Sequence, residues 1–276
     1  MFRAKKSLSQ NFLHDVRVIR KIVELSKNNS KIIFEIGAGT GNLTDVILAQ
    51  LQDHQKLIAI EVDTDLVNQL QTRFDQCIRV GKLEIIHTDF KTFNFGQLGG
   101  DYSIIANVPY HLTKLIIRDI FSADNLPNSI YFVIQDDVAE RIVERDGKGS
   151  LLSKSVLVYA DAKILYNISR GAFSPAPNVD SALLGLTNIS RDKMTADNEV
   201  YFYVLRAGFA HKRKKLLQNL SHILNKEKLH KYFEKLNLSI DIRAEELSTE
   251  QWLGLVHLLE TDILHNNDGL TQETIY

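Results

Sequence analysis

"KIIFEIGAGTGNLT" (31–44) is the stretch of the sequence that decides the fold. It opens with an apolar run, typical of a strand buried on both faces, and runs directly into Gly37, Gly39 and Gly41. Residues 42–52 then show apolar side chains at helical spacing. Because glycine admits positive φ angles and a close approach to the backbone, this turn is a candidate ligand site. The simpler alternative is a tight turn that does nothing more than connect a strand to a helix.

The alternation of short apolar runs with amphipathic stretches continues to about residue 135. Strands are expected at 31–37, 56–63, 82–89, 102–107 and 129–135, with helices at 42–52 and 64–76. Repeated strand–helix units imply a parallel sheet with right-handed crossovers. Two further strands, at 162–169 and 181–189, follow with little helix between them. We therefore expect an α/β fold with a Rossmann-like sheet.

Beyond about residue 190 the pattern becomes helical, at 198–210, 214–224 and 248–264. The last of these helices opens with Ser248 and Gln251 in the register of a capping box. The sequence thus predicts a cofactor-binding catalytic domain over 1–190 and a small all-helical domain over 191–276. The final dozen residues are polar and aperiodic, so we expect them to fray.

The composition limits the class of protein. The chain has 276 residues, 44% of them hydrophobic, and a single cysteine, Cys77, which excludes an internal disulfide and a cysteine-cluster zinc site. The sequence has no apolar leader, and no apolar run approaches the roughly 20 residues that cross a bilayer. We expect a soluble, cytoplasmic and monomeric protein that needs no metal.

The charge is unevenly distributed, although the net charge is −1. Residues 1–21 carry six lysines and arginines against Asp15, and 206–231 carry eight against Glu227. Clustered cations of this kind release counterions from phosphates, so the two stretches suggest contact with a polyanion. Two solvated helix faces would give the same pattern.

The ends of the predicted strands point to a nucleoside cofactor. The turn has the spacing G-x-G-x-G and lacks the G-x-G-x-x-G with which dinucleotide-binding proteins seat a pyrophosphate. Glu61 ends the next strand, where an acid can bond both hydroxyls of a ribose. Asp89 ends the third strand, where its carboxylate could accept a hydrogen bond from the amino group of an adenine. Phe90, next to it, could pack on the adenine ring. Ribose and adenine without a pyrophosphate cradle suggest S-adenosylmethionine.

The fourth strand ends unusually, in "YSIIANVPYHL" (102–112). Proline cannot donate to a sheet, so the strand stops near Asn107, and the amide stands beside Pro109 and Tyr110. An amide oxygen and a backbone carbonyl can accept hydrogen bonds from the two N–H groups of an exocyclic amine as charge develops on the nitrogen. A tyrosine face can stack on the base. These residues predict direct methyl transfer to a nucleobase nitrogen, governed mainly by positioning.

Many ordered motifs give the chain a resemblance to the ribosomal RNA adenine dimethyltransferases that modify two adjacent adenosines near the 3′ end of small-subunit rRNA. They are "KKSLSQNFLHD" (5–15), "EIGAGTGNLT" (35–44), "IEVD" (60–63), "TDFKTFNF" (88–95), "NVPYHLT" (107–113), "VAERI" (138–142), "GAFSPAPNVDSAL" (171–183), "FAHKRKKLLQNL" (209–220) and "RAEELSTEQW" (243–252). The resemblance covers nearly the whole chain. It implies S-adenosylmethionine as cofactor and rRNA of an immature small subunit as substrate.

The resemblance also assigns roles to residues. The residues it implies for the cofactor are Gln10, Asn11, Leu13, Gly37, Gly39, Glu61, Val62, Asp89, Phe90 and Asn107. Tyr110 and Phe173 look like the two faces that stack on the target adenine, although Phe173 would otherwise be read as a core anchor. The basic run Lys212, Arg213, Lys214 and Lys215, opening a helix, looks like an rRNA-binding surface.

Three other functions remain open at the level of sequence. The related large-subunit rRNA adenine methyltransferases of the macrolide-resistance type would share the cofactor and the Asn-x-Pro-Tyr chemistry. A non-catalytic ribosome-assembly factor could retain the fold. A nicotinamide-dependent dehydrogenase fits least well, because the third-glycine spacing is absent.

Overall fold

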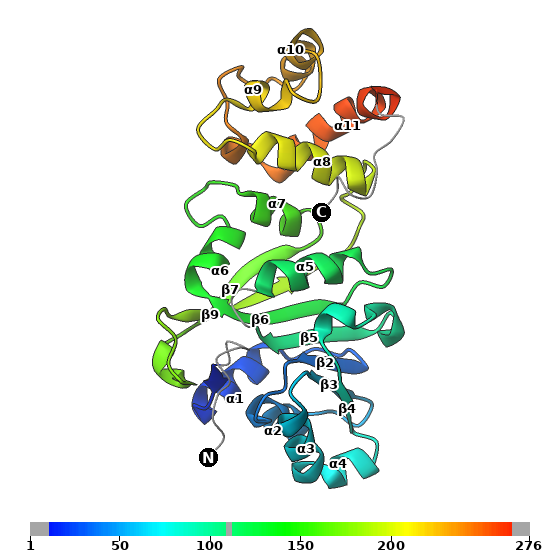
Figure 1. The fold of residues 1–276 in the computed structure, drawn as a ribbon, viewed down its shortest axis with the longest axis vertical. Coiled ribbons are helices and arrows are strands. Elements are labelled where there is room, and N and C mark those ends of the chain that lie inside the picture. Colours follow the sequence, from blue (N-terminus) through cyan, green and yellow to red (C-terminus); the bar gives the residue numbers. More distant parts are fainter. Residues whose placement is uncertain (1–10, 109–111, 267–276) are drawn as a thin grey trace. The chain divides into compact units, whose positions relative to one another are not determined.

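The computed structural model describes residues 11–108 and 112–266 and divides into two compact units (Figure 1). We call Met1–Ala139 with Asp161–Ile189 the sheet unit, and Glu140–Ala160 with Ser190–Tyr276 the helical unit. The sequence-based division at residue 190 left 140–160 with the sheet, whereas in the structure this segment packs with the helices of the second unit. In the described residues no helix is long and apolar enough to span a membrane.

The sheet unit is built on a seven-stranded sheet of order β4-β3-β2-β5-β6-β9-β7. Its strands are β2 (Ile32–Ile36), β3 (Lys56–Glu61), β4 (Leu83–His87), β5 (Tyr102–Asn107), β6 (Ser129–Gln135), β7 (Asp161–Ile168) and β9 (Ser181–Thr187). The first five are parallel, as the sequence predicted, and β9 and β7 add to the edge in antiparallel fashion. A separate pair joins β1 (Phe12–Leu13) to β8 (Phe173–Ser174), also antiparallel.

Helices cover both faces of this sheet, which is why its central strands are largely apolar (Figure 1). They are α1 (Val16–Leu25), α2 (Asn42–Leu48), α3 (Thr64–Arg73), α4 (Asp75–Arg79), α5 (Thr113–Ser122) and α6 (Asp136–Ile142). α1 and α2 bury Ile22 and Ile47 against one face. In the middle of β2, Phe34 stacks on Phe93 with ring centroids 4.8 Å apart. The helix expected over 64–76 is interrupted at Phe74, which ends α3.

The helical unit contains α7 (Leu151–Leu157), α8 (Asn198–Phe209), α9 (Leu216–Leu220), α10 (Lys226–Lys235) and α11 (Thr249–Asn266). The predicted capping box of α11 is confirmed, because Ser248 Oγ accepts from Gln251 N at 3.1 Å and Gln251 Oε1 accepts from Ser248 N at 2.9 Å. The helix expected over 214–224 is shorter, since its basic first residues form a turn. Of the last dozen residues, predicted to fray, 265 and 266 form the end of α11, and 267–276 lie outside the described residues.

Candidate active site at the carboxyl edge of the sheet

Three neighbouring strands end at the same level. The register pairs Ile36, the last residue of β2, with the residue before Glu61 on β3 and with the residue before Asn107 on β5. Gly37 therefore lies level with both side chains, and its N–H donates to the carbonyl of Ile60 on β3 at 2.9 Å. The structure thus brings together an acid, a glycine turn and an amide on one sheet edge.

Asp89 extends this row by one strand. Glu61 is level with His87 of β4, and Asp89 lies two residues beyond it, where its carboxylate accepts from Lys91 N at 3.1 Å. Adjacent strands are about 4.8 Å apart, so the row from β4 to β5 extends over about 14 Å. The neighbouring Phe90 is buried, with 8% of its surface exposed, and so offers little of its ring to a ligand.

The carboxylate of Glu61 is already engaged by backbone. One oxygen accepts from Val62 N and Asp63 N at 2.9 and 3.0 Å, and the other accepts from Gly39 N at 2.8 Å. A carboxylate has about four acceptor sites, so roughly one remains. Two ribose hydroxyls can bond Glu61 together only if a backbone bond is given up. The side chain of Val62, by contrast, is exposed beside it.

The three glycines of the turn have different surroundings. Gly37 has a φ of +74°, and no residue that the structure describes lies within 4 Å of where a side chain would start. At Gly39 the ring of Phe12 comes within 3.2 Å of the position of a Cβ, and Gly41 is packed tightly against α3. Of the three, Gly37 is therefore the one with room for a ligand beside it.

An amino-terminal segment crosses the edge of the sheet next to this row. Asn107 Nδ2 donates to the carbonyl of Asn11 at 3.0 Å, and β1 pairs Leu13 with Phe173 of β8. The amide N–H of Asn107 is thus directed at protein, which leaves its oxygen on the other side of the group. This places the predicted residues Asn11 and Leu13 at the edge where the row of strand tips lies.

Phe173 is buried, with 3% of its surface exposed, and packs in the hydrophobic core with Ile168 and Leu183. This is the position of a core anchor. A base can stack on the ring only if the ring becomes uncovered, so its stacking role stays a prediction. The other predicted residues of this site, Gln10, Pro109 and Tyr110, lie outside the described residues.

Glu35 is a charged residue that the motif reasoning did not single out. It is 1% exposed within β2, and Thr44 Oγ1 donates to its carboxylate at 2.7 Å. Burial raises the pKa of Glu35 to about 7; the hydrogen bond from Thr44 opposes this rise, and the negative charge of Glu61 adds to it. The sequence signal for this residue is an acid inside the otherwise apolar run "KIIFEIG".

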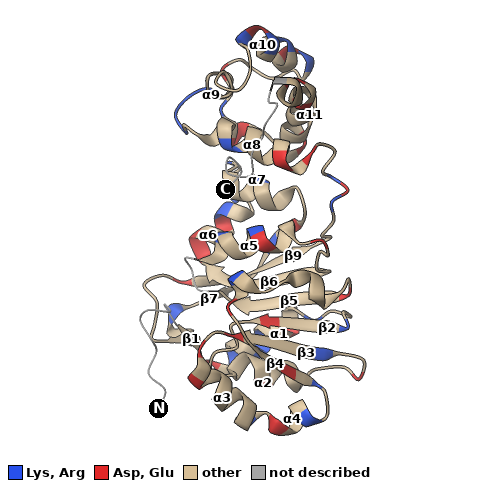
Figure 2. Cartoon of the chain, turned by 45° about the vertical axis from the view of Figure 1, so that its right-hand side comes forward, with Lys and Arg blue, Asp and Glu red and all other residues tan. Residues whose placement is uncertain are grey.

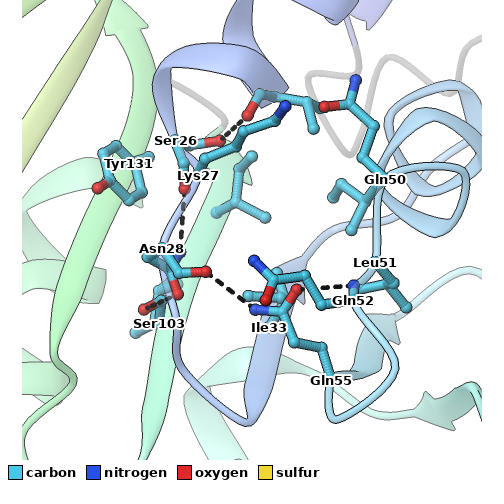
Figure 3. A pocket seen from close by; sticks show the side chains of 14 residues that line it. Ser26, Lys27, Asn28, Ile33, Gln50, Leu51, Gln52, Gln55, Ser103 and Tyr131 are labelled. Carbon is cyan, nitrogen blue, oxygen red and sulfur yellow. Dashed lines mark hydrogen bonds between the residues drawn. The ribbon is translucent and has the colours of Figure 1, made fainter.

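A cavity of about 190 Å³ lies at the opposite, amino edge of the sheet (Figure 3). Its polar wall is internally bonded: Gln55 Nε2 donates to the carbonyl of Asn28 at 3.0 Å, and Ser103 Oγ donates to Asn28 Oδ1 at 3.0 Å (Figure 3). These groups hold the loops that precede the strands. The strand tips described above are at the other end of the sheet, away from this cavity.

The predicted RNA-binding residues lie in an exposed turn between α8 and α9, coloured blue in Figure 2, and precede the helix they were expected to open. Lys215 forms an ion pair with Asp241. Within the described residues, Lys212, Arg213 and Lys214 have no such partner. We call these three residues the basic turn.

The basic turn is held by a buried amide. Asn219, 2% exposed on α9, donates from Nδ2 to the carbonyls of Gly208 and His211 at 2.6 and 3.1 Å. Gly208 in turn lies against Trp252, where a Cβ would overlap the indole. The cations are therefore presented by a fixed backbone. Within the described ranges, no cluster of three or more His, Cys, Asp or Glu side chains could hold a metal.

Comparisons with known proteins agree with this geometry. The family described as "Ribosomal RNA adenine dimethylase" matches residues 1–261. Proteins named "Ribosomal RNA small subunit methyltransferase A" are 34% identical in Mycoplasmopsis pulmonis, over 92% of this chain and 98% of that protein, and 36% identical in Sulfurimonas denitrificans, over 92% and 93%.

Solved structures show the same fold. The crystal structure of a dimethyladenosine transferase from Plasmodium falciparum is 25% identical, with a TM-score of 0.77 over 91% of this chain and 98% of that chain. The 23S rRNA methyltransferase ErmE, at 20% identity, has a TM-score of 0.71 over 90% and 99%, a likeness of fold. The chain therefore belongs to the ribosomal RNA adenine dimethylase family of methyltransferases.

Proposed function

We propose that this protein transfers methyl groups from S-adenosylmethionine to the exocyclic amino groups of two adjacent adenosines near the 3′ end of small-subunit rRNA, during ribosome biogenesis. The observation that carries the proposal is the level arrangement of Glu61, Gly37 and Asn107 on three neighbouring strand ends. Family membership and the names of the relatives support the choice of substrate.

The residues of this edge fit the cofactor. Gly37 has open space beside it, Glu61 retains about one acceptor site for a ribose hydroxyl, and the exposed Val62 offers an apolar contact for a base. Asp89 would accept from the adenine amino group at the far end of the row. The bound cofactor supplies an electrophilic methyl group, which would lie at the Asn107 end.

Asn107 would act on the target adenine. An exocyclic amine is a weak nucleophile because its lone pair is delocalised into the ring. An amide oxygen that accepts a hydrogen bond from one N–H group of the amine favours a more tetrahedral nitrogen. This hydrogen bond strengthens as positive charge develops on the nitrogen. Because Asn107 Nδ2 donates to the carbonyl of Asn11, the amide oxygen lies on the other side of the group, where it would face the base. Tyr110 would stack on the extruded base.

We further propose that the basic turn contacts rRNA phosphates of an immature small subunit, and that the protein acts as a cytoplasmic monomer without a metal. Phosphate contacts of this kind give affinity that falls with salt, and they orient the protein without reading sequence. In this proposal the sheet unit carries the cofactor and the chemistry, and the helical unit contributes RNA binding.

The decisive experiment is mass spectrometry of rRNA nucleosides from strains with and without the gene. Loss of dimethyladenosine from small-subunit rRNA in the deletion strain is expected. Primer extension locates the modified bases, and a lost block in large-subunit rRNA would instead assign the macrolide-resistance type of activity. Binding to small subunits without transfer of labelled methyl groups would favour a non-catalytic assembly factor.

The role of the amide is tested by Asn107→Ala, which should abolish methyl transfer and leave cofactor affinity largely intact. Asn167→Ala is the matched control, because Asn167 is also a strand asparagine but its side chain is exposed on β7. Turnover retained by Asn107→Ala would refute the role of this oxygen.

A further inference from the structure

The segment that orients the Asn107 amide is itself held at several points. We call residues 11–15 the strap. Its first carbonyl, that of Asn11, accepts from Asn107 Nδ2 at 3.0 Å. Its middle pairs with β8, and the N–H of His14 donates to the carbonyl of Ala172 at 2.9 Å. The strap thus connects the tip of β5 with the loop that carries Phe173.

A further contact ties the strap to the glycine turn. Asn42 Nδ2 donates to the carbonyl of Leu13 at 3.0 Å, in partly buried surroundings. Asn42 is the first residue of α2 and directly follows Gly41, so its backbone position is set by the same turn that lies beside the candidate cofactor site. The strap pairs with β8 through only two residues, and so short a pairing gives little rigidity by itself.

The orientation of the Asn107 amide depends on the strap. A terminal amide can be turned by half a rotation, which exchanges its oxygen with its NH₂ group. The carbonyl of Asn11 accepts hydrogen bonds and cannot donate, so it selects the orientation in which NH₂ faces the strap. A displaced strap would allow the NH₂ group to face the target adenine, where it would meet another donor.

We propose that Asn42 is a positioning residue for methyl transfer: its bond to Leu13 fixes the strap, and the strap keeps the oxygen of Asn107 toward the target amine. The proposal rests on the proposed function of this site. It assigns to Asn42 a role in the step at the adenine; because Asn11 and Leu13 of the strap are also predicted cofactor residues, affinity for S-adenosylmethionine should change, but much less than the rate.

The kinetic test compares Asn42→Ala and Asn42→Asp with the wild-type enzyme in single-turnover methylation of under-methylated small subunits. Both variants remove the donor, and Asn42→Asp does so at nearly constant size. We expect the rate constant at saturating concentrations of both substrates to fall about 10- to 100-fold, as for a misplacement of about 1 Å. The dissociation constant of S-adenosylmethionine, measured by calorimetry, should change less than about threefold.

Two further variants separate positioning from general loss of structure. Asn42→Gln retains an amide donor and should recover part of the rate. Asn68→Asp, on the exposed surface of α3, is the control for an added charge and should leave the rate unchanged. An unchanged rate in Asn42→Ala, or a loss of rate matched by an equal loss of cofactor affinity, would overturn the proposal.

A spectroscopic test does not depend on the activity. In ¹⁵N-labelled protein, the side-chain amide signal of Asn107 is assigned by its disappearance in Asn107→Ala. Asn42→Ala should shift that signal and speed the exchange of its protons with solvent, while the signal of Asn128, bonded to Ser30 and Asp101, serves as internal reference. An unaltered Asn107 signal would refute the coupling. If the wild-type enzyme methylates no adenosine, the proposed function fails, and this signal still decides whether the strap orients the amide.

Discussion

Three glycines of the sheet unit have nearly the same backbone angle but different surroundings, and this allows a matched test of what the glycine turn does. Gly37, Gly41 and Gly81 have φ values of +74°, +79° and +74°. Among the described residues, a Cβ at Gly37 or at Gly81 would meet nothing within 4 Å. Gly81 lies in an exposed turn before β4, away from the carboxyl edge of the sheet, so Gly81→Ala reports the cost of the backbone angle alone.

The size of each effect follows from these contacts. An alanine held at a left-handed angle costs about 1–2 kcal/mol, and this cost is common to all three variants. At Gly41 the new Cβ would be 2.7 Å from Leu70 Cδ2 and 2.8 Å from Phe74 Cε2, both on buried side chains of the α3 region. Overpacking of a core costs about 1–3 kcal/mol. Gly41→Ala should therefore lose about 1–3 kcal/mol more of the free energy of unfolding than Gly81→Ala.

Gly37→Ala should behave differently. Its stability should match that of Gly81→Ala, because neither methyl group meets protein. The methyl group at Gly37 would instead occupy space beside Glu61 and Asn107, so affinity for S-adenosylmethionine should fall in this variant and stay unchanged in Gly81→Ala. Urea unfolding gives the stabilities, and calorimetry with S-adenosylmethionine gives the affinities.

Equal stabilities of the Gly41→Ala and Gly81→Ala proteins would show that α3 does not constrain the turn as the contacts indicate. Equal cofactor affinities of the Gly37→Ala and Gly81→Ala proteins would show that the open space beside Gly37 does not receive the cofactor. The two results are independent, because one concerns packing beneath the turn and the other concerns the ligand above it.

The remaining predictions concern Glu35 and the basic turn. Burial holds the pKa of Glu35 at about 7 in the folded protein, against an ordinary value of 4.5, so between these two pH values the folded state keeps a proton that the unfolded state has lost. The free energy of unfolding of the wild-type protein should consequently fall, relative to that of Glu35→Gln, as the pH rises from about 4.5 to 7, and parallel pH profiles of the two proteins would contradict this. Replacing Lys212, Arg213 or Lys214 by alanine should each reduce the slope of log binding constant against log salt concentration, measured for subunit binding, by about 0.7–0.9. Lys215→Ala should reduce this slope less, because Asp241 competes for that cation. Four equal reductions would show that the ion pair does not persist on the ribosome.

The sequence predicted the sheet because each strand is a short apolar run bounded by turn residues. "KIIFEIG", "KLIAIEVD" and "YSIIAN" all appear as parallel strands at the expected places. Their last residues predicted the functional edge, since carboxyl ends of parallel strands share one edge. Contacts between segments that are distant in the sequence could not be predicted from local patterns. Segment 140–160 joins the helical unit, and the helix expected over 214–224 is reduced to α9, because long-range packing overrides local periodicity.

The same limit applies within the site, where residue types were predictable but their hydrogen-bond partners were not. Spacing alone placed an acid and an amide at one edge of the sheet, and it could not reveal that the backbone already occupies three acceptor sites of Glu61. Nor could it reveal that the N–H group of Asn107 is taken by Asn11. These bonds determine which atoms remain for ligands: about one acceptor site on the acid and the oxygen of the amide. In the reaction that we propose, this edge would therefore depend on the strap as much as on the strand ends, since the strap would decide which atom of Asn107 a bound purine amine meets.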